Sequence, residues 1–160
     1  MTGALTVLLL LASAATPDAG TPQPSRVRVT VRAIAATSGT EQIDPKLKPI
    51  AKNLAEFSKD FRYRNFQLAS EQTLDLPFES AAQAELPGSR SLQITPRQMA
   101  ADGRIKVHLE LLGEHPAHSR KLHTDYTIQR GGTIFVGGLR LDPQKPDRGM
   151  LLIAVTQEIE

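Results

Sequence analysis

Apolar and polar residues alternate with a period of two through much of residues 103–139. The first run places an apolar side chain at every second position, at Ile105, Val107, Leu109 and Leu111. A second run repeats this spacing, at Leu122, Thr124, Tyr126 and Ile128. The period is typical of strands with one buried and one exposed face. With residues 114–117 as a loop and Gly131 and Gly132 as a turn, the pattern predicts three consecutive antiparallel strands.

A four-residue loop would fix the register of the first two strands. It would bring apolar side chains together in the core and opposite charges together on the exposed face. The predicted cross-strand pairs are Lys106–Asp125, Glu110–Lys121, Leu109–Leu122, Ile105–Tyr126 and His108–His123. Across the glycine turn, we expect Ile128 to face Phe135.

One helix is predicted after Asp44, which is a good N-cap and is followed by a proline suited to the first helical position. Apolar residues then recur at helical spacing, at Leu47, Ile50, Ala51, Leu54, Phe57 and Phe61. Pro49 should kink the helix or make it restart, because it lacks a backbone N–H. The polar side carries Lys46, Lys48, Lys52 and Lys59. We expect the helix to pack over a sheet, with docking on a membrane surface as the alternative.

A strand is predicted at residues 26–37, with valines on one face and Arg26, Arg28 and Arg32 on the other. These arginines could form an anionic-ligand site, but a solvated face that protects a sheet edge is the favoured interpretation. Other strands are predicted at residues 62–69, 74–78, 92–94 and 150–159, and loops at 80–88 and 140–149. The last strand is apolar on both faces as far as Val155, which places it in the middle of a sheet.

The order of these elements predicts a mainly β (α+β) fold, an antiparallel β-sandwich of about eight strands with one packed α-helix. Residues 26–160 should form a single β-rich domain. Residues 1–15 have the apolar run and small residues of a signal peptide, although no Lys or Arg precedes the run. Residues 16–25 read as a flexible linker. We therefore expect a periplasmic or secreted protein with no transmembrane segment in the mature chain.

Composition narrows the possible functions. The 160 residues include 19 basic and 17 acidic side chains without a long run of either sign, so nucleic acid is not an expected partner. The absence of cysteine excludes disulfides, thiolate zinc sites and a cysteine nucleophile. We find no nucleophile elbow, phosphate-binding loop or dinucleotide fingerprint. We therefore expect no enzyme and no cofactor, and nominate no catalytic residue.

All four histidines fall within residues 108–123. In the predicted register His108 faces His123, and the two imidazoles could hold Zn or Cu with His115 or His118 completing the set. No carboxylate or thiolate is obviously placed to help. Exposed polar residues are therefore the favoured interpretation, and metal binding is the alternative.

Two resemblances bear on function. Residues 43–48 (Ile-Asp-Pro-Lys-Leu-Lys) and 131–138 (Gly-Gly-Thr-Ile-Phe-Val-Gly-Gly) resemble small exported proteins of unassigned function from Gram-negative bacteria. Residues 122–153 are similar to part of the outer-membrane secretin family, in which a Thr-rich strand leads into a Gly-x-Thr-apolar-apolar-x-Gly-Gly-Leu segment. The secretin resemblance implies a shared hairpin geometry or an envelope-assembly context.

From these observations we expect a non-enzymatic exported protein that binds a protein or a cell-envelope component. The alternative is a periplasmic protein that binds Zn or Cu through histidines.

Overall fold

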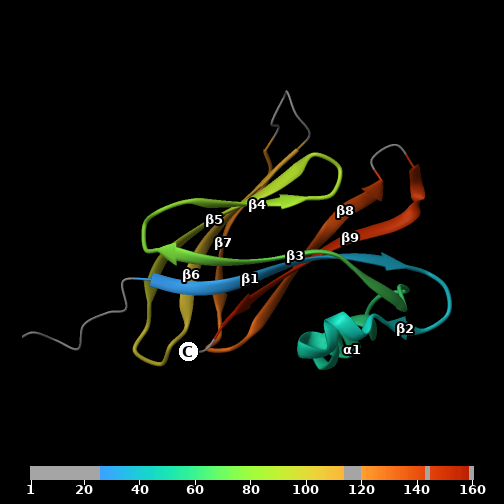
Figure 1. The fold of residues 1–160 in the computed structure, drawn as a ribbon, viewed down its shortest axis with the longest axis horizontal. Helices are drawn as coiled ribbons and strands as arrows, with labels where there is room; N and C mark the ends of the chain where they lie inside the picture. Colours follow the sequence, from blue (N-terminus) through green and yellow to red (C-terminus); the bar gives the residue numbers. More distant parts are fainter. Residues whose placement is uncertain (1–25, 114–119, 143–144, 159–160) are drawn as a thin grey trace, which may run out of the picture.

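A computed structural model describes residues 26–113, 120–142 and 145–158. These residues form two β-sheets packed face to face, with one α-helix against the outer face of the larger sheet (Figure 1). The predicted mainly β sandwich with a packed helix is confirmed. The described residues contain nine strands, one of them only two residues long, rather than about eight. The predicted signal peptide, linker and hairpin loop lie outside the described residues.

The larger sheet, sheet A, has the strand order β2-β3-β1-β9-β8. Its strands are β1 Arg26–Thr37, β2 Gln42–Ile43, β3 Asn65–Pro77, β8 Thr133–Asp142 and β9 Lys145–Gln157. Sheet B has the order β4-β5-β6-β7, with β4 Ala82–Leu86, β5 Arg90–Met99, β6 Ile105–Leu112 and β7 Arg120–Ile128. The short β2 runs parallel to β3, which departs from the predicted antiparallel arrangement at one sheet edge.

The main core lies between the two sheets. Strand β1 contributes Val27, Val29 and Val31 from its predicted apolar face, and β6 contributes Val107 and Leu109 from the opposite sheet. All five side chains are at most 5% exposed. Burial of these alternating aliphatic side chains is the main force that holds the sheets together.

A second core lies between sheet A and the helical segment. The outer face of β1 is polar at first and becomes apolar at Ile34 and Ala36, and the helix covers this apolar half. Strand β9 supplies Leu152 and Ala154 to the second core while its alternate residues enter the main core. The prediction that this strand is buried on both faces in the middle of a sheet is therefore confirmed.

The helical segment changes type two residues after Pro49, close to where a kink or a restart was predicted. A 3₁₀ helix, Pro45–Ile50, precedes the α-helix α1, Ala51–Ser58. The carboxylate of Asp44 accepts hydrogen bonds from the backbone N–H groups of Lys46 and Leu68, each at 3.0 Å. Asp44 therefore caps the helical segment and also ties it to β3.

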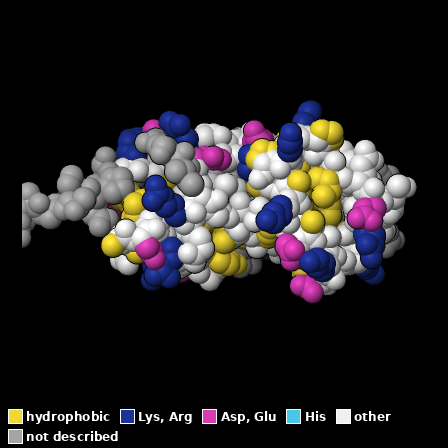
Figure 2. Space-filling model, turned by 90° about the horizontal axis from the view of Figure 1, so that it is seen from below, with side chains coloured by type: hydrophobic (Ala, Val, Ile, Leu, Met, Phe, Trp, Pro, Cys, Tyr) yellow, Lys and Arg dark blue, Asp and Glu magenta, His cyan; other side chains and the backbone are white. Residues whose placement is uncertain are grey.

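Figure 2 shows the surface that includes α1, where apolar side chains lie among lysines, arginines and carboxylates. Phe61 is 43% exposed, and its ring stacks on Phe57 at 4.2 Å. Within the described ranges, no helix is long and apolar enough to cross a membrane.

The predicted three-stranded meander is wrong. Strand β8 pairs with β9 in sheet A, whereas β7 belongs to sheet B, so Ile128 does not face Phe135. The turn after β7, closed by a 2.8 Å bond from Gly132 N to Gln129 O, carries the chain from one sheet to the other. The physical reason lies in β8, which has apolar side chains on both faces. Val136 enters the main core and Phe135 packs against the second, and among the described residues only sheet A has a core on each side.

Several predicted boundaries also need correction. The two strands predicted at residues 62–69 and 74–78 are the single strand β3, and the predicted loop at 80–88 contains β4. Strand β5 continues past Pro96, where a register shift accommodates the missing N–H. Strands β8 and β9 extend into the predicted loop at 140–149.

The arginine face of β1 does not protect a sheet edge, because β1 lies between β3 and β9. Arg32 is only 6% exposed, and its Nε donates to Glu71 at 2.9 Å. The predicted solvated face is therefore wrong for Arg32, whose charge is neutralised by a neighbouring strand. Arg26 is exposed and pairs with Asp75 at 3.2 Å.

Candidate metal centre

The candidate site lies on the polar outer face of sheet B, and it depends on how β6 pairs with β7. The observed register differs from the predicted one by two residues. Glu110 is opposite His123, and His108 is opposite Asp125. A bulge between Leu111 and Leu112 accounts for part of the difference, and no feature of the sequence marked it.

The predicted direct pairs are therefore wrong. Lys106 is opposite Thr127, Leu109 is opposite Thr124, and Ile105 is opposite Ile128. Because the shift is even, each of these β6 residues keeps its predicted face. Lys106 Nζ still lies 3.9 Å from Asp125 Oδ2 across the diagonal. The predicted Glu110–Lys121 pair is also wrong, because Glu110 lies opposite His123.

Two histidines and one glutamate meet on this face. His108 Nε2 lies 3.3 Å from Glu110 Oε1, and His123 Nε2 lies 3.6 Å from the same oxygen. The two imidazole rings contact each other edge to face, with centroids 4.5 Å apart. One potential ligand atom from each residue lies within 4.8 Å of the other two. The three residues can therefore converge on one metal ion.

Asp125 orients His108 from the other side of the ring. The two residues are cross-strand partners, and His108 Nδ1 is 2.7 Å from Asp125 Oδ1. This hydrogen bond is the main reason that the pKa of Asp125 lies below its ordinary value, and the charge of Lys106 lowers the pKa further. An ionised carboxylate only accepts hydrogen bonds, so Nδ1 carries the hydrogen and donates. In a neutral His108 the lone pair is then on Nε2, the nitrogen that faces Glu110.

This arrangement concentrates electron pairs in a small space. The Nε2 of neutral His108 and the Glu110 carboxylate are both acceptors, and at 3.3 Å they repel each other unless a cation lies between them. Protons on the imidazoles or a bound metal ion would each relieve the repulsion. The side chains of His108 and Glu110 are only 15% and 17% exposed, so water screens the repulsion incompletely.

The geometry suits a small divalent transition metal. Ligand atoms in a tetrahedral zinc site lie roughly 3.3 Å apart, given Zn–N bonds of about 2.0–2.1 Å. The distances from His108 Nε2 and His123 Nε2 to Glu110 Oε1 are close to this value. Two imidazoles and a carboxylate leave one position open in tetrahedral geometry. The Asp125–His108 bond is the kind of outer contact that commonly fixes a metal-binding histidine.

The sequence predicted only part of this site. It predicted that His108 and His123 share a face of one hairpin, and the structure brings them together as diagonal neighbours. The expectation that no carboxylate helps them was wrong, because Glu110 had been paired with Lys121. His115 and His118 lie outside the described residues, so their suggested contribution is not tested.

Comparisons of the chain with protein-family models, with curated proteins and with solved structures find no match. The resemblances to exported Gram-negative proteins and to the secretin family therefore stay predictions.

Proposed function

We propose that this protein is a non-enzymatic binding protein whose ligand is a divalent transition-metal ion, held by His108, Glu110 and His123. The observation that carries the proposal is the convergence of three ligand atoms within 4.8 Å. The hydrogen bond that His108 Nδ1 donates to Asp125 supports it, because this bond directs Nε2, the other ring nitrogen, toward Glu110.

Zn²⁺ and Cu²⁺ are the metals that this set of ligands favours. Imidazole binds both ions well, and a carboxylate oxygen is compatible with both. A site made of nitrogen and oxygen on an open sheet face offers no thiolate, so it has no preference for Cu⁺. Two ligands come from β6 and the third from β7, so the hairpin needs no loop residue to form the site.

The proposal includes an exported location and a partner in the cell envelope. The predicted signal peptide at residues 1–15 supports export, and the exposed Phe61 beside the lysines of α1 supports contact with a protein or an envelope component. Cell fractionation with mass analysis of the mature N-terminus tests the location. An uncleaved protein found entirely in the cytoplasm would contradict export, while leaving the metal proposal intact.

Isothermal titration calorimetry of the full chain with ZnCl₂ and with CuSO₄ tests metal binding. We expect one ion per chain, and a double variant His108→Ala, His123→Ala that binds neither metal measurably. Asp125→Asn should weaken binding by about 10–100-fold, the usual effect of losing an outer hydrogen-bond partner.

The matched control is the double variant His115→Ala, His118→Ala, which removes the chain's other two imidazoles. It should keep the affinity of the parent protein. If this control loses binding and the His108, His123 variant keeps it, the metal is bound by other residues and the proposal is wrong. Circular dichroism of each variant confirms that its fold is retained.

A further inference from the structure

A groove of about 430 Å³ lies between α1 and the edge of sheet A at β2, and Figure 1 shows β2 beside this helix. The C-terminal half of α1 forms one wall, and the residues at the starts of β2 and β3 form the other. The volume falls within the range of small-molecule sites. The groove shares no residue with the proposed metal centre, which lies on sheet B.

The second core supplies the apolar part of this groove. Ile43 packs against that core, and Phe66 is buried within it. Side chains two positions apart along an extended strand point to the same face. Glu41 precedes Ile43 by two positions and Arg64 precedes Phe66 by two, so both charged side chains face the helix, and both line the groove.

Glu41 and Arg64 lie side by side at one end of the groove. Strand β2 runs parallel to β3 with Ile43 beside Phe66, and the N–H of Gln42 donates to the carbonyl oxygen of Arg64 at 3.1 Å. Because the two strands run in the same direction, both charged residues come first and both apolar residues follow. The groove therefore has one end with a charge of each sign and one apolar end.

The two charges are open to a ligand. Both residues are exposed, and neither side chain has a hydrogen bond or an ion pair among the described residues. Lys59, the other cation of the lining, already pairs with Glu56 at 3.0 Å. A ligand that carries both charges can therefore bind Glu41 and Arg64 without displacing a partner.

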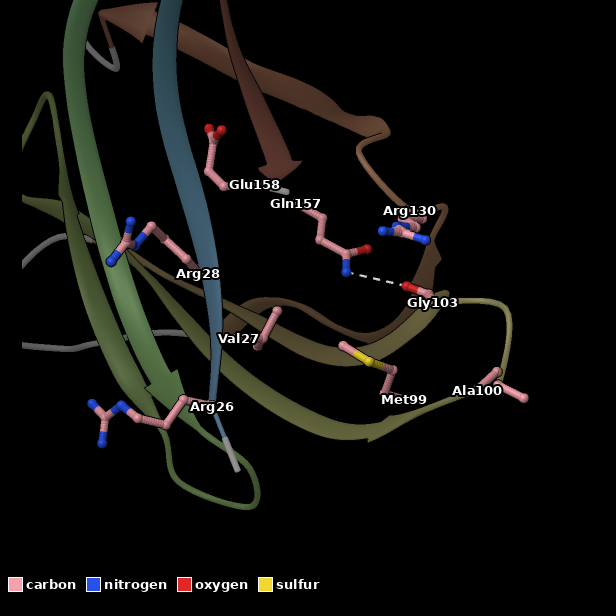
Figure 3. Close-up of a pocket in the computed structure, with 10 residues that line it drawn as sticks. Arg26, Val27, Arg28, Met99, Ala100, Gly103, Arg130, Gln157 and Glu158 are labelled. Carbon is pink, nitrogen blue, oxygen red and sulfur yellow. Dashed lines mark hydrogen bonds between the residues drawn. The ribbon is translucent and has the colours of Figure 1, made fainter. Parts of the chain in front are cut away.

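The cavity drawn in Figure 3, of about 350 Å³ at the start of β1, does not offer such a matched set. Arg26 and Arg28 extend from one side of β1, whereas Arg130 and Gln157 lie on the other. Arg26 also pairs with Asp75 at 3.2 Å. The charges of that cavity therefore do not converge on one small ligand.

We propose that the groove beside α1 binds a free α-amino acid with an aliphatic side chain. The α-carboxylate accepts paired hydrogen bonds from the guanidinium group of Arg64, and the α-ammonium group donates to the carboxylate of Glu41. The hydrocarbon side chain extends along the groove and packs on Ile43 and Ala55. A simple acid or a simple amine leaves one of the two protein charges unmatched, so the zwitterion is the favoured ligand.

Calorimetric titration of the full chain with L-leucine at neutral pH tests the proposal. Two matched compounds each lack one charged group: 4-methylpentanoate has no ammonium group, and isopentylamine has no carboxylate. The protein is first freed of metal with a chelator and dialysed, because an amino acid can also coordinate a metal ion. We expect saturable binding of one leucine per chain, and at least about 10-fold weaker binding of each matched compound.

Variants assign each charged group of the ligand to its residue. Arg64→Met should weaken leucine binding by at least about 10-fold and leave the affinity for isopentylamine unchanged. Glu41→Gln should bind leucine and 4-methylpentanoate with similar affinity, because nothing then distinguishes the ammonium group. The matched controls Arg62→Met and Glu85→Gln make the same changes at exposed residues outside the lining, and they should bind leucine like the parent.

Three results would overturn the proposal. Equal affinity of the parent for leucine and 4-methylpentanoate would remove the role of Glu41. Unchanged leucine affinity in Arg64→Met, or no saturable binding of leucine by the parent, would remove the site. Loss of metal binding in the histidine variants has no bearing on these outcomes.

Discussion

Replacing Leu54 with alanine tests whether the helix is an integral part of the fold. The side chain is fully buried in the second core, among Ile34, Phe66 and Leu152. The change removes three carbon atoms, which at about 0.8 kcal/mol for each buried CH₂ is a transfer loss of about 2.4 kcal/mol. A residual cavity of roughly 40 Å³ would add about 1 kcal/mol. The expected loss in the free energy of unfolding is therefore about 3 kcal/mol.

Urea unfolding followed by circular dichroism measures this loss. The matched control is Asn53→Ala, the neighbouring exposed position on the same helix, which should change the stability by no more than about 0.5 kcal/mol. A loss below about 1 kcal/mol for Leu54→Ala would refute the packing of α1 on sheet A. An unchanged slope of the urea transition would show that the variant still unfolds as one unit.

Two further predictions concern the cap and the main core. Hydrogen bonds from the backbone N–H groups of Lys46 and Leu68 hold the pKa of Asp44 below its ordinary value near 3.8, so this carboxylate stabilises the fold above about pH 4 and loses its effect as pH falls through the lowered pKa. The stability advantage of the parent over Asp44→Asn should therefore shrink on acidification in urea titrations, and an advantage that grows would contradict the assignment. Leu109→Asp should unfold the protein, because it would leave a lone carboxylate in an aliphatic core, while Thr127→Asp at an exposed position should fold with a native circular dichroism spectrum.

The fold class followed from local patterns that tertiary contacts did not override. The period-two alternation of β6 placed Val107 and Leu109 in the core, and the sequence around Pro49 predicted a helix that restarts. Each pattern indicates which side of an element is buried, and in the sandwich these sides face the cores. Strand neighbours were harder to predict, because the alternation of β7 and β8 is compatible with a hairpin as well as with a crossing between sheets.

For the candidate metal site, the sequence predicted only the sheet face on which the histidines lie. Register errors of two residues leave every side chain on the same face, so hydrophobic patterning cannot detect them. The charged pairs that seemed to confirm the predicted register are weak contributors at a surface, and they could not select it. For that reason Glu110 was predicted to pair with Lys121, and the proximity of Glu110 to the histidines was missed.

Buried polar groups were the least predictable feature. Arg90 is 5% exposed, and it donates to the carbonyl oxygens of Pro87, Arg140 and Leu141 at 2.9, 2.7 and 3.2 Å. It links the turn before β5 to strand β8 of the other sheet. Its partners are backbone oxygens from distant residues, and such partners leave no signature in the pattern of side chains.

The pairing of β1 with β9 sets an order for the assembly of the protein. Residues that meet across this pair are far apart in sequence, and Thr30 and Glu158 are separated by 128 positions. Sheet B, in contrast, joins strands that follow one another along the chain. Closing a long loop costs more entropy than closing a hairpin, so sheet B can form early while sheet A waits for β9. Until β9 has been synthesised, one edge of β1 has no partner strand for its backbone N–H and C=O groups, and such an open edge can pair with other extended chains.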